Sequence, residues 1–241
     1  MEILAIIPAR GGSKGIPNKN VKMLAGKPLI YYSIEAGHNS KYVTRTVLST
    51  EAENVKKVAQ EYGCEVIDRP IELAQDTTMT IPVMIHVLNY LKEKENYEPD
   101  AVVLLQPTCP LRDSKRLDKV IECYFENLKK GHDSVFAVKS IGTTHSLWRQ
   151  VPNTEKFEPL YDSRTRPRRQ DEHRHYPMYR ETGSAYICET KVMREVNDFI
   201  GKNPMVYVVN QSIDIDEPED FDEIEKILKA RNNWWTKHYF L

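Results

Sequence analysis

Cysteine is scarce in this 241-residue chain, and no hydrophobic stretch approaches the length of a membrane span. Such a span needs ~20 consecutive apolar residues, so a membrane partner is not expected. The N-terminus lacks the basic start and long apolar run of a signal peptide, which predicts a soluble, cytoplasmic protein. The cysteines form no CxxC pair and no Cys/His zinc spacing, so we interpret them as reduced thiols. They are Cys64, Cys109, Cys123 and Cys188.

An excess of charge of either sign is also missing. The chain has 34 Lys and Arg residues against 35 Asp and Glu residues, a net charge of −1. Proteins that bind nucleic acid usually have a basic balance or a basic face, so nucleic acid is not an expected partner. A site for an anionic ligand must then depend on a local cluster of basic residues.

Short apolar runs alternate with longer helical patterns through the first 140 residues, as in repeated βαβ units. Their continuously apolar strands predict an α/β fold with a parallel sheet covered on both faces. The expected strands are Ile3–Ile7, Thr46–Ser49, Glu65–Ile67, Ala101–Leu105, Ser134–Val138, Ser184–Cys188, Val206–Asn210 and Ser212–Ile215. The expected helices are Pro28–Gly37, Ala52–Tyr62, Thr80–Lys94, Ser114–Lys129 and Pro218–Ala230, the last with Phe221, Ile224, Ile227 and Leu228 facing the core.

The alternating pattern stops between Ser140 and Glu181, where charges are dense and apolar periodicity is lost. Because this stretch is too long for an ordinary loop, we predict that 140–183 is a subdomain inserted into a main domain of 1–139 and 184–241. Six arginines lie between Arg164 and Arg180, a local cluster suited to gripping a carboxylate or phosphate. A solvated arm is the competing interpretation.

A basic, glycine-rich loop follows the first expected strand, where open α/β sheets bind ligands. Its glycines allow close backbone approach to a ligand, and its three cations suit a triphosphate. These residues are Arg10, Gly11, Gly12, Lys14, Gly15 and Lys19. The spacing is neither GxGxxG nor GxxxxGK[ST], so neither the dinucleotide fingerprint nor the P-loop applies.

Gln106 and the pair Asp214 and Asp216 are further candidate binding residues. Gln106 follows an apolar strand and precedes prolines, and its amide suits recognition of a sugar hydroxyl or N-acyl group, although it could simply brace the loop. Asp214 and Asp216 would share one face of a strand, and paired carboxylates suit Mg²⁺. With Pro218 and Glu219, Asp216 also fits an N-cap of the last helix.

Six motifs in this order resemble the N-acylneuraminate cytidylyltransferases, or CMP-sialic acid synthetases. They are Ala9-Arg10-Gly11-Gly12-Ser13-Lys14-Gly15 with Asn18-Lys19-Asn20, Arg69-Pro70-Ile71-Glu72-Leu73-Ala74-Gln75-Asp76-Thr77, Leu104-Leu105-Gln106-Pro107-Thr108-Cys109-Pro110-Leu111-Arg112, Arg168-Arg169-Gln170-Asp171, Tyr179-Arg180-Glu181-Thr182-Gly183-Ser184-Ala185-Tyr186 and Ser212-Ile213-Asp214-Ile215-Asp216.

The resemblance implies a three-layer α/β sandwich with a mainly parallel sheet, like the nucleotide-diphospho-sugar transferases, and a small protruding dimerisation element. It implies CMP transfer from CTP to the anomeric hydroxyl of a nonulosonic acid, N-acetylneuraminic acid or a close analogue, with Mg²⁺ and in a homodimer. The alternatives are another sugar nucleotidyltransferase, such as a CMP-Kdo, CMP-legionaminate or CMP-pseudaminate synthetase, or a non-catalytic nucleotide-binding protein.

By the same resemblance, residues of this chain acquire roles. The expected nucleotide-binding residues are Ala9, Arg10, Gly11, Asn20, Arg69 and Thr80, and the catalytic residues are Arg10, Lys14, Lys19 and Gln106. The expected sugar-binding residues are Gln106, Arg169, Arg180 and Tyr186, and the metal ligands are Asp214 and Asp216. Arg69 could instead form a surface ion pair with Glu72, and Tyr186 could be a core tyrosine.

The motif Arg180-Glu181-Thr182-Gly183 departs from the family, in which sialic acid enzymes usually carry Arg-x-Asn-Gly. The hydroxyl of threonine has less reach than the asparagine amide. This departure leaves the identity of the sugar open.

Overall fold

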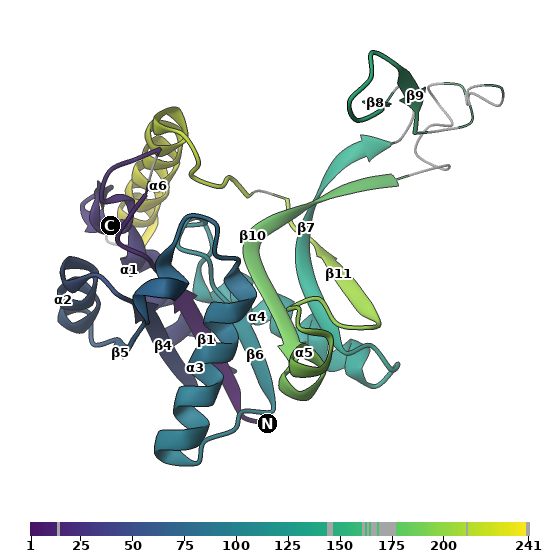
Figure 1. The fold of residues 1–241 in the computed structure, drawn as a ribbon. Helices are drawn as coiled ribbons and strands as arrows, with labels where there is room; N and C mark the ends of the chain where they lie inside the picture. Colours follow the sequence, from purple (N-terminus) through teal and green to yellow (C-terminus); the bar gives the residue numbers. More distant parts are fainter. Residues whose placement is uncertain are drawn as a thin grey trace.

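A computed structural model of the chain describes residues 1–13, 15–143, 147–160, 162, 164, 168, 177–210 and 212–239, without the side chains of 143 and 232–239. Its centre is a seven-stranded sheet in the order β11-β7-β10-β6-β1-β4-β5 (Figure 1). The strands are β1 Ile3–Pro8, β4 Arg45–Thr50, β5 Glu65–Asp68, β6 Ala101–Leu104, β7 Ser134–Thr143, β10 Pro177–Glu189 and β11 Pro204–Val208. The predicted mainly parallel sheet is confirmed, with β10 alone antiparallel to both of its neighbours in the sheet.

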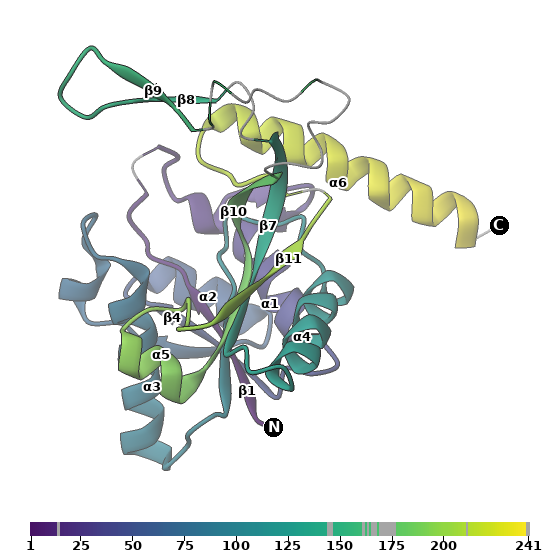
Figure 2. The same cartoon turned by 90° about the vertical axis from the view of Figure 1, so that its right-hand side faces the viewer.

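Helices cover both faces of the sheet, which gives the predicted three layers (Figure 2). Alternate residues of β1 separate into two clusters, because successive side chains of a strand point to opposite faces. Ile3 and Ile7 pack with α1, α2 and α4, whereas Leu4 and Ile6 pack with α3 and α5. The helices are α1 Leu29–His38, α2 Glu53–Glu61, α3 Thr80–Glu95, α4 Ser114–Leu128, α5 Thr190–Val196 and α6 Pro218–Tyr239.

Short elements complete the connections. The 3₁₀ helix η1 covers Lys19–Val21 and η2 covers Ile71–Ala74. A small hairpin joins β2, Met23–Leu24, to β3, Lys27–Pro28. None of these was expected from the sequence, because each is too short for a periodic hydrophobic pattern.

Strands β7 and β10 run well past the other strands and carry a second hairpin at their end (Figure 1). This hairpin pairs β8, Trp148–Gln150, with β9, Phe157–Pro159. We call the described residues 140–143, 147–160 and 177–181 the arm. The arm lies within the predicted insertion and exposes aromatic side chains, with Trp148 51% and Phe157 63% accessible.

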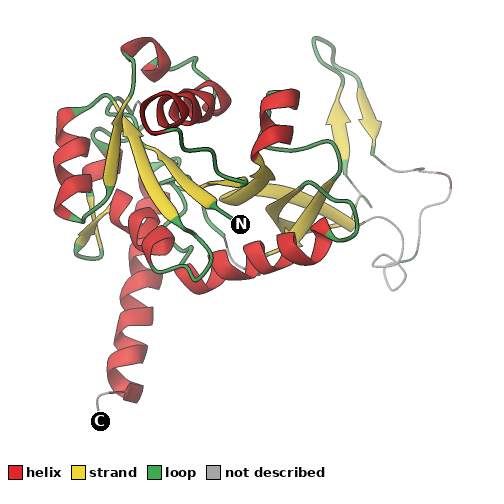
Figure 3. Ribbon diagram, turned by 90° about the horizontal axis from the view of Figure 1, so that it is seen from below, coloured by secondary structure: helices red, strands yellow, loops and turns green. Residues whose placement is uncertain are grey.

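The C-terminal region differs from expectation in two ways. Residues 212–215 are irregular rather than a strand. Among the described residues, the segment makes one backbone hydrogen bond outside regular elements, from Ile215 N to the Thr108 carbonyl. Helix α6 continues to Tyr239, and its distal part projects from the body (Figure 3). Its predicted core face is confirmed, since Phe221, Ile224 and Leu228 are buried and Ile227 is partly buried against them. Among the described residues, no helix has the length and hydropathy that a membrane crossing requires.

Candidate active site

A cleft of about 410 Å³ opens at the carboxyl ends of β1 and β6. Parallel strands deliver their following loops to this edge of the sheet, where α/β proteins bind ligands. Six residues predicted for the nucleotide or the chemistry line this single cleft. They are Arg10, Lys19, Asn20, Arg69, Thr80 and Gln106.

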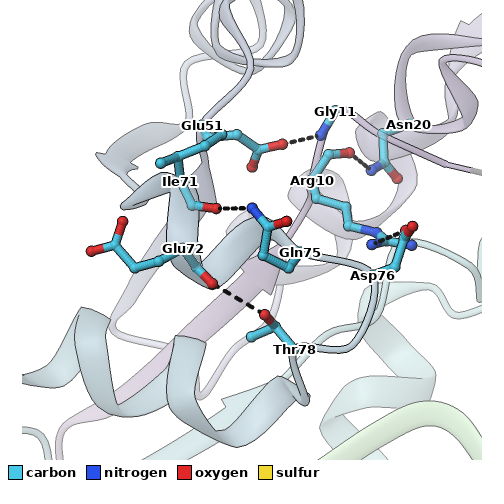
Figure 4. Close-up of polar contacts among 9 residues, drawn as sticks. All are labelled: Arg10, Gly11, Asn20, Glu51, Ile71, Glu72, Gln75, Asp76 and Thr78. Carbon is cyan, nitrogen blue, oxygen red and sulfur yellow. Dashed lines mark hydrogen bonds and ion pairs between the residues drawn. The ribbon is translucent and has the colours of Figure 1, made fainter.

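The basic loop is anchored at Gly11. Its backbone N–H donates to Glu51 Oε1 at 2.7 Å, and a Cβ at this position would lie 2.4 Å from the Cβ of Ala52 (Figure 4). Glycine is therefore required here by close packing against the segment after β4. The N–H that was expected to bind a phosphate is occupied by Glu51, and Gly11 does not line the cleft.

Arg10 reaches across the cleft to the segment between η2 and α3. Its Nη1 lies 2.7 Å from Asp76 Oδ1, while its carbonyl accepts from Asn20 Nδ2 at 2.7 Å. The opposite segment is braced on η2, because Gln75 donates to the carbonyl of Ile71 at 2.8 Å (Figure 4). Both sides of the cleft are thus held in place by short contacts.

Arg69 is buried, so its proposed surface ion pair with Glu72 is wrong. Its guanidinium donates to the carbonyl of Ser49 at 2.6 Å and to the Ser49 hydroxyl at 3.2 Å. Burial lowers the pKa of Arg69 to about 10, the charge of Arg10 adds to this effect, and Glu51 opposes it. The guanidinium remains charged at neutral pH and adds positive potential to the cleft.

Lys19 links the basic loop to residues 214–216, which we call the acidic segment. Its Nζ donates to the carbonyl of Ile215 at 2.8 Å, between Asp214 and Asp216. Burial lowers the pKa of Lys19, and the neighbouring charge of Asp216 partly offsets that effect. Lys19, which lines the cleft, therefore has two carboxylates as neighbours.

Gln106 lies in the turn after β6, and this turn packs against Gly183 of β10. The pairing of β10 with β7 shifts register between Glu181 and Tyr186. Such bulges occur next to active sites, where they redirect the chain. Here the bulge brings Gly183 against Gln106 and Asp214, and Gly183 N donates to Asp214 Oδ2 at 3.5 Å. The thiol of Cys109 donates to the other carboxylate oxygen.

Asp216 does not cap the last helix. The carboxylate that closes the start of α6 is Asp220, whose Oδ2 accepts from Asp216 N at 2.9 Å and from Glu217 N at 2.8 Å. These two backbone donors lower the pKa of Asp220. The side chain of Asp216 is exposed beside the basic loop, and its assignment as a metal ligand stays a prediction.

The remaining predicted residues lie elsewhere. Ala9 is fully buried and supports the loop through Ala9 N, which donates to the Ser49 carbonyl at 3.0 Å. Arg180 is exposed on the arm and does not line the cleft. Tyr186 belongs to the core, where it packs on Phe136 and Phe199, so its placement in a sugar pocket is not supported. Lys14 and Arg169 lie outside the described residues.

Thr182 does not face the cleft. Its hydroxyl donates to the carbonyl of Ala137 at 3.2 Å, and only 5% of the residue is exposed. The departure from Arg-x-Asn-Gly therefore places a hydroxyl inside the sheet, where it bonds to the backbone of β7.

Sequence reasoning missed two acidic residues of the site. Glu51 directly follows β4, the same position at the carboxyl edge that singled out Gln106, so that rule would have found it. Asp76 was quoted in a motif without a role, and its contact with Arg10 spans 66 residues of sequence. No local pattern reveals a contact of that separation.

A three-layer α/β sandwich with a basic cleft at its carboxyl edge is the framework of nucleotidyltransferases, and the fold comparison agrees. The structure of CMP:2-keto-3-deoxy-manno-octonic acid synthetase complexed with CTP matches with a TM-score of 0.70 and 16% identity, over 96% of this chain and 100% of that one. The cytidylyltransferase family model matches residues 4–239. The chain belongs to the cytidylyltransferase family.

Two curated relatives narrow the resemblance. The CMP-N,N'-diacetyllegionaminic acid synthase of Legionella pneumophila is 34% identical, over 95% of this chain and 97% of its own. The N-acylneuraminate cytidylyltransferase of Escherichia coli O18:K1:H7 is 30% identical over 96% of this chain, which spans about half (53%) of that protein. The predicted N-acylneuraminate cytidylyltransferase-like family is thereby confirmed.

Proposed function

We propose that this protein transfers CMP from CTP to the anomeric hydroxyl of a nonulosonic acid, N-acetylneuraminic acid or a close analogue such as a legionaminic acid, and releases pyrophosphate. The observation that carries the proposal is the convergence of Arg10, Lys19, Arg69 and Gln106 on one cleft. Three cations suit a triphosphate, and a neutral amide suits the hydroxyl or acyl groups of a sugar.

The reaction makes limited covalent demands on the protein. A bond forms between the anomeric oxygen and the α-phosphorus, the bond from that phosphorus to the bridging oxygen breaks with pyrophosphate as the leaving group, and the hydroxyl proton passes to solvent. Such transfers depend chiefly on alignment and on cations placed around oxygens whose negative charge shifts. In this chain Arg10 and Lys19 supply those cations, and Gln106 orients the sugar from the turn after β6.

The acidic segment fits a magnesium ion in its donor chemistry. Mg²⁺ is bound through one or two carboxylates together with substrate phosphates. Asp216 is exposed beside Lys19, and Asp214 accepts hydrogen bonds on both oxygens but keeps other lone pairs. We assign the ion to these two residues, where it would neutralise phosphate charge and lower the pKa of the sugar hydroxyl.

The direct test is a substrate panel. The protein is incubated with CTP, Mg²⁺ and, in separate reactions, N-acetylneuraminic, legionaminic, pseudaminic and deaminated nonulosonic acids and Kdo. We expect pyrophosphate and an equimolar CMP-sugar, identified by mass spectrometry, with at least one nine-carbon acid. Tight CTP binding without pyrophosphate from any acid would reject the proposal. Chelation by EDTA should abolish turnover, and added Mg²⁺ should restore it.

A matched pair of lysine variants ties the activity to the cleft. Lys19→Ala removes a cation that lines the cleft, whereas Lys57→Ala removes one from α2 that does not line it. We expect Lys19→Ala to lower kcat/KM for CTP about 100-fold, because a hydrogen bond to a charged group contributes ~1.5–3 kcal/mol. Lys57→Ala should retain wild-type kinetics.

We further propose a homodimer in which the arm completes the neighbouring active site. Its exposed Trp148 and Phe157 support a protein contact, since aromatic residues are enriched in interfaces. Light scattering should give twice the chain mass of 28.0 kDa. If Arg180 acts in the partner's site, mixing inactive Lys19→Ala and Arg180→Ala proteins should restore part of the activity. A monomeric active enzyme would contradict this arrangement.

A further inference from the structure

Three separate segments meet at Gly183, beside Gln106 and Asp214. A Cβ built on Gly183 would lie 2.2 Å from Gln106 Oε1, 2.8 Å from Asp214 Oδ1 and 2.9 Å from Cys109 Sγ. Real Cβ atoms do not approach other atoms so closely. The β10 bulge, the turn after β6 and the acidic segment are therefore packed to contact around this glycine.

Within this contact, Cys109 is the closest donor to Asp214. Its Sγ donates to Asp214 Oδ1, while the second donor, Gly183 N, lies 3.5 Å from Oδ2, the outer limit of a hydrogen bond. Cys109 is only 2% exposed, so water has little access to its thiol. Among the described residues, Cys109 thus makes the shorter of the two hydrogen bonds to the Asp214 carboxylate.

Arg112 holds the segment that carries Cys109. Its Nη1 donates to the Ser184 carbonyl at 2.7 Å and to the Gln106 carbonyl at 3.3 Å, and its Nη2 donates to Ser33 Oγ at 2.5 Å. The residue is 3% exposed. One buried guanidinium therefore joins the turn after β6 to β10 and α1. These hydrogen bonds hold the backbone around Cys109 in place.

We propose that Cys109 is a positioning residue, whose thiol fixes the Asp214 carboxylate beside Gln106, so that the ion assigned to Asp214 and the amide that orients the sugar acid keep their relative positions. This role rests on the proposed function for its substrate, but the contact itself does not. This positioning role is distinct from that of a nucleophile, because the Cys109 thiol faces Asp214 and Cys109 does not line the nucleotide cleft.

The kinetic test compares three single-atom changes. Cys109→Ser keeps a donor, Cys109→Ala removes it, and Cys188→Ala truncates an equally buried thiol whose Sγ contacts the Glu189 carbonyl. We expect Cys109→Ala to lower kcat/KM for the sugar acid about tenfold while the KM for CTP changes less than about twofold. Cys109→Ser should recover most of the loss, and Cys188→Ala should retain wild-type kinetics. Wild-type kinetics in Cys109→Ala, or equal losses in the alanine and serine variants, would overturn the proposal.

An infrared measurement tests the contact without any substrate. The S–H stretching band of Cys109 is isolated as the difference between wild-type and Cys109→Ser spectra. Donation to a carboxylate lowers that frequency, so the band should lie below that of Cys188 and move upward in Asp214→Ala. An unchanged band in Asp214→Ala would refute the positioning role. This result stands even if Cys109→Ala fails to fold or no sugar acid is turned over.

Discussion

Arg10 and Asp76 form an ion pair across the cleft, with Nη1 and Oδ1 2.7 Å apart. Arg10 comes from the loop after β1, and Asp76 from the segment between η2 and α3. Both side chains are partly exposed, 32% and 42%. The guanidinium that we assign to the triphosphate therefore already contacts an anion of the protein.

The Asp76→Asn variant should bind CTP more tightly than the wild-type protein. The carboxylate competes with the triphosphate for Arg10, and exposed ion pairs contribute ~0.2–1 kcal/mol, so Kd should fall by up to about fivefold. Isothermal titration calorimetry at low and high salt measures the change. Arg10→Ala is the opposing variant and should weaken binding. Weaker binding in Asp76→Asn would mean that Asp76 orients Arg10 for the phosphates.

Gly183→Ala should abolish turnover while CTP binding is retained. The added Cβ would displace the Gln106 amide and the Asp214 carboxylate together, because it lies 2.2 and 2.8 Å from their oxygens. Pyrophosphate release and CTP titration distinguish the two effects. Ser184→Ala is the matched control, since it keeps the Ser184 carbonyl to which Arg112 donates, and it should stay close to wild type. Loss of CTP binding in Gly183→Ala would show that the change spreads to the nucleotide side.

The sequence predicted the fold best where apolar periodicity was long. The helix expected at Thr80–Lys94 is α3, Thr80–Glu95, and the strand expected at Thr46–Ser49 lies within β4. The segment expected as a strand at Ser212–Ile215 is irregular. Ile215 is buried and Ile213 is partly buried against the core face of α6, so the alternation of Ile and Asp reflects this packing rather than a position in the sheet. A strand needs a partner ladder, which a single chain segment does not reveal.

The sequence predicted those residues of the candidate site that lie in loops directly after buried strands. Gln106 and Lys19 were found because each follows a buried strand at the carboxyl edge. The alternative interpretation of Tyr186 as a core tyrosine fits the packing of its ring on Phe136 and Phe199, and its sugar contact stays a prediction. Cys109 was interpreted only as a reduced thiol, because its partner Asp214 lies 105 residues further along the chain. Long-range contacts of this kind require the folded chain.

His86 should make the protein less stable in mild acid. Burial, together with the charge of Arg69, lowers its pKa from 6.5, and its buried Nδ1 has no hydrogen-bond partner among the described atoms. Below pH 6.5 the unfolded chain therefore binds this proton more readily than the folded one, so stability falls as the pH falls. The decrease in Tm between pH 7.5 and 5.5 should be smaller in His86→Gln than in wild type. His38→Gln, an exposed histidine of α1, controls for the loss of a histidine, and an unchanged slope in His86→Gln would contradict the prediction.

Substitutions of Asp216 and Asp220 should have different effects, one on catalysis and the other on the stability of helix α6. Asp220 accepts from the N–H groups of Asp216 and Glu217, so Asp220→Asn should lower the free energy of unfolding by ~0.5–1 kcal/mol. Asp216→Asn removes an exposed carboxylate assigned to Mg²⁺, so turnover should fall at least about 100-fold with little change in stability. Urea unfolding and pyrophosphate release measure the two effects on the same preparations. The opposite assignment, with a stable and active Asp220→Asn and an active but destabilised Asp216→Asn, would return the cap to Asp216 and require another residue to hold the metal.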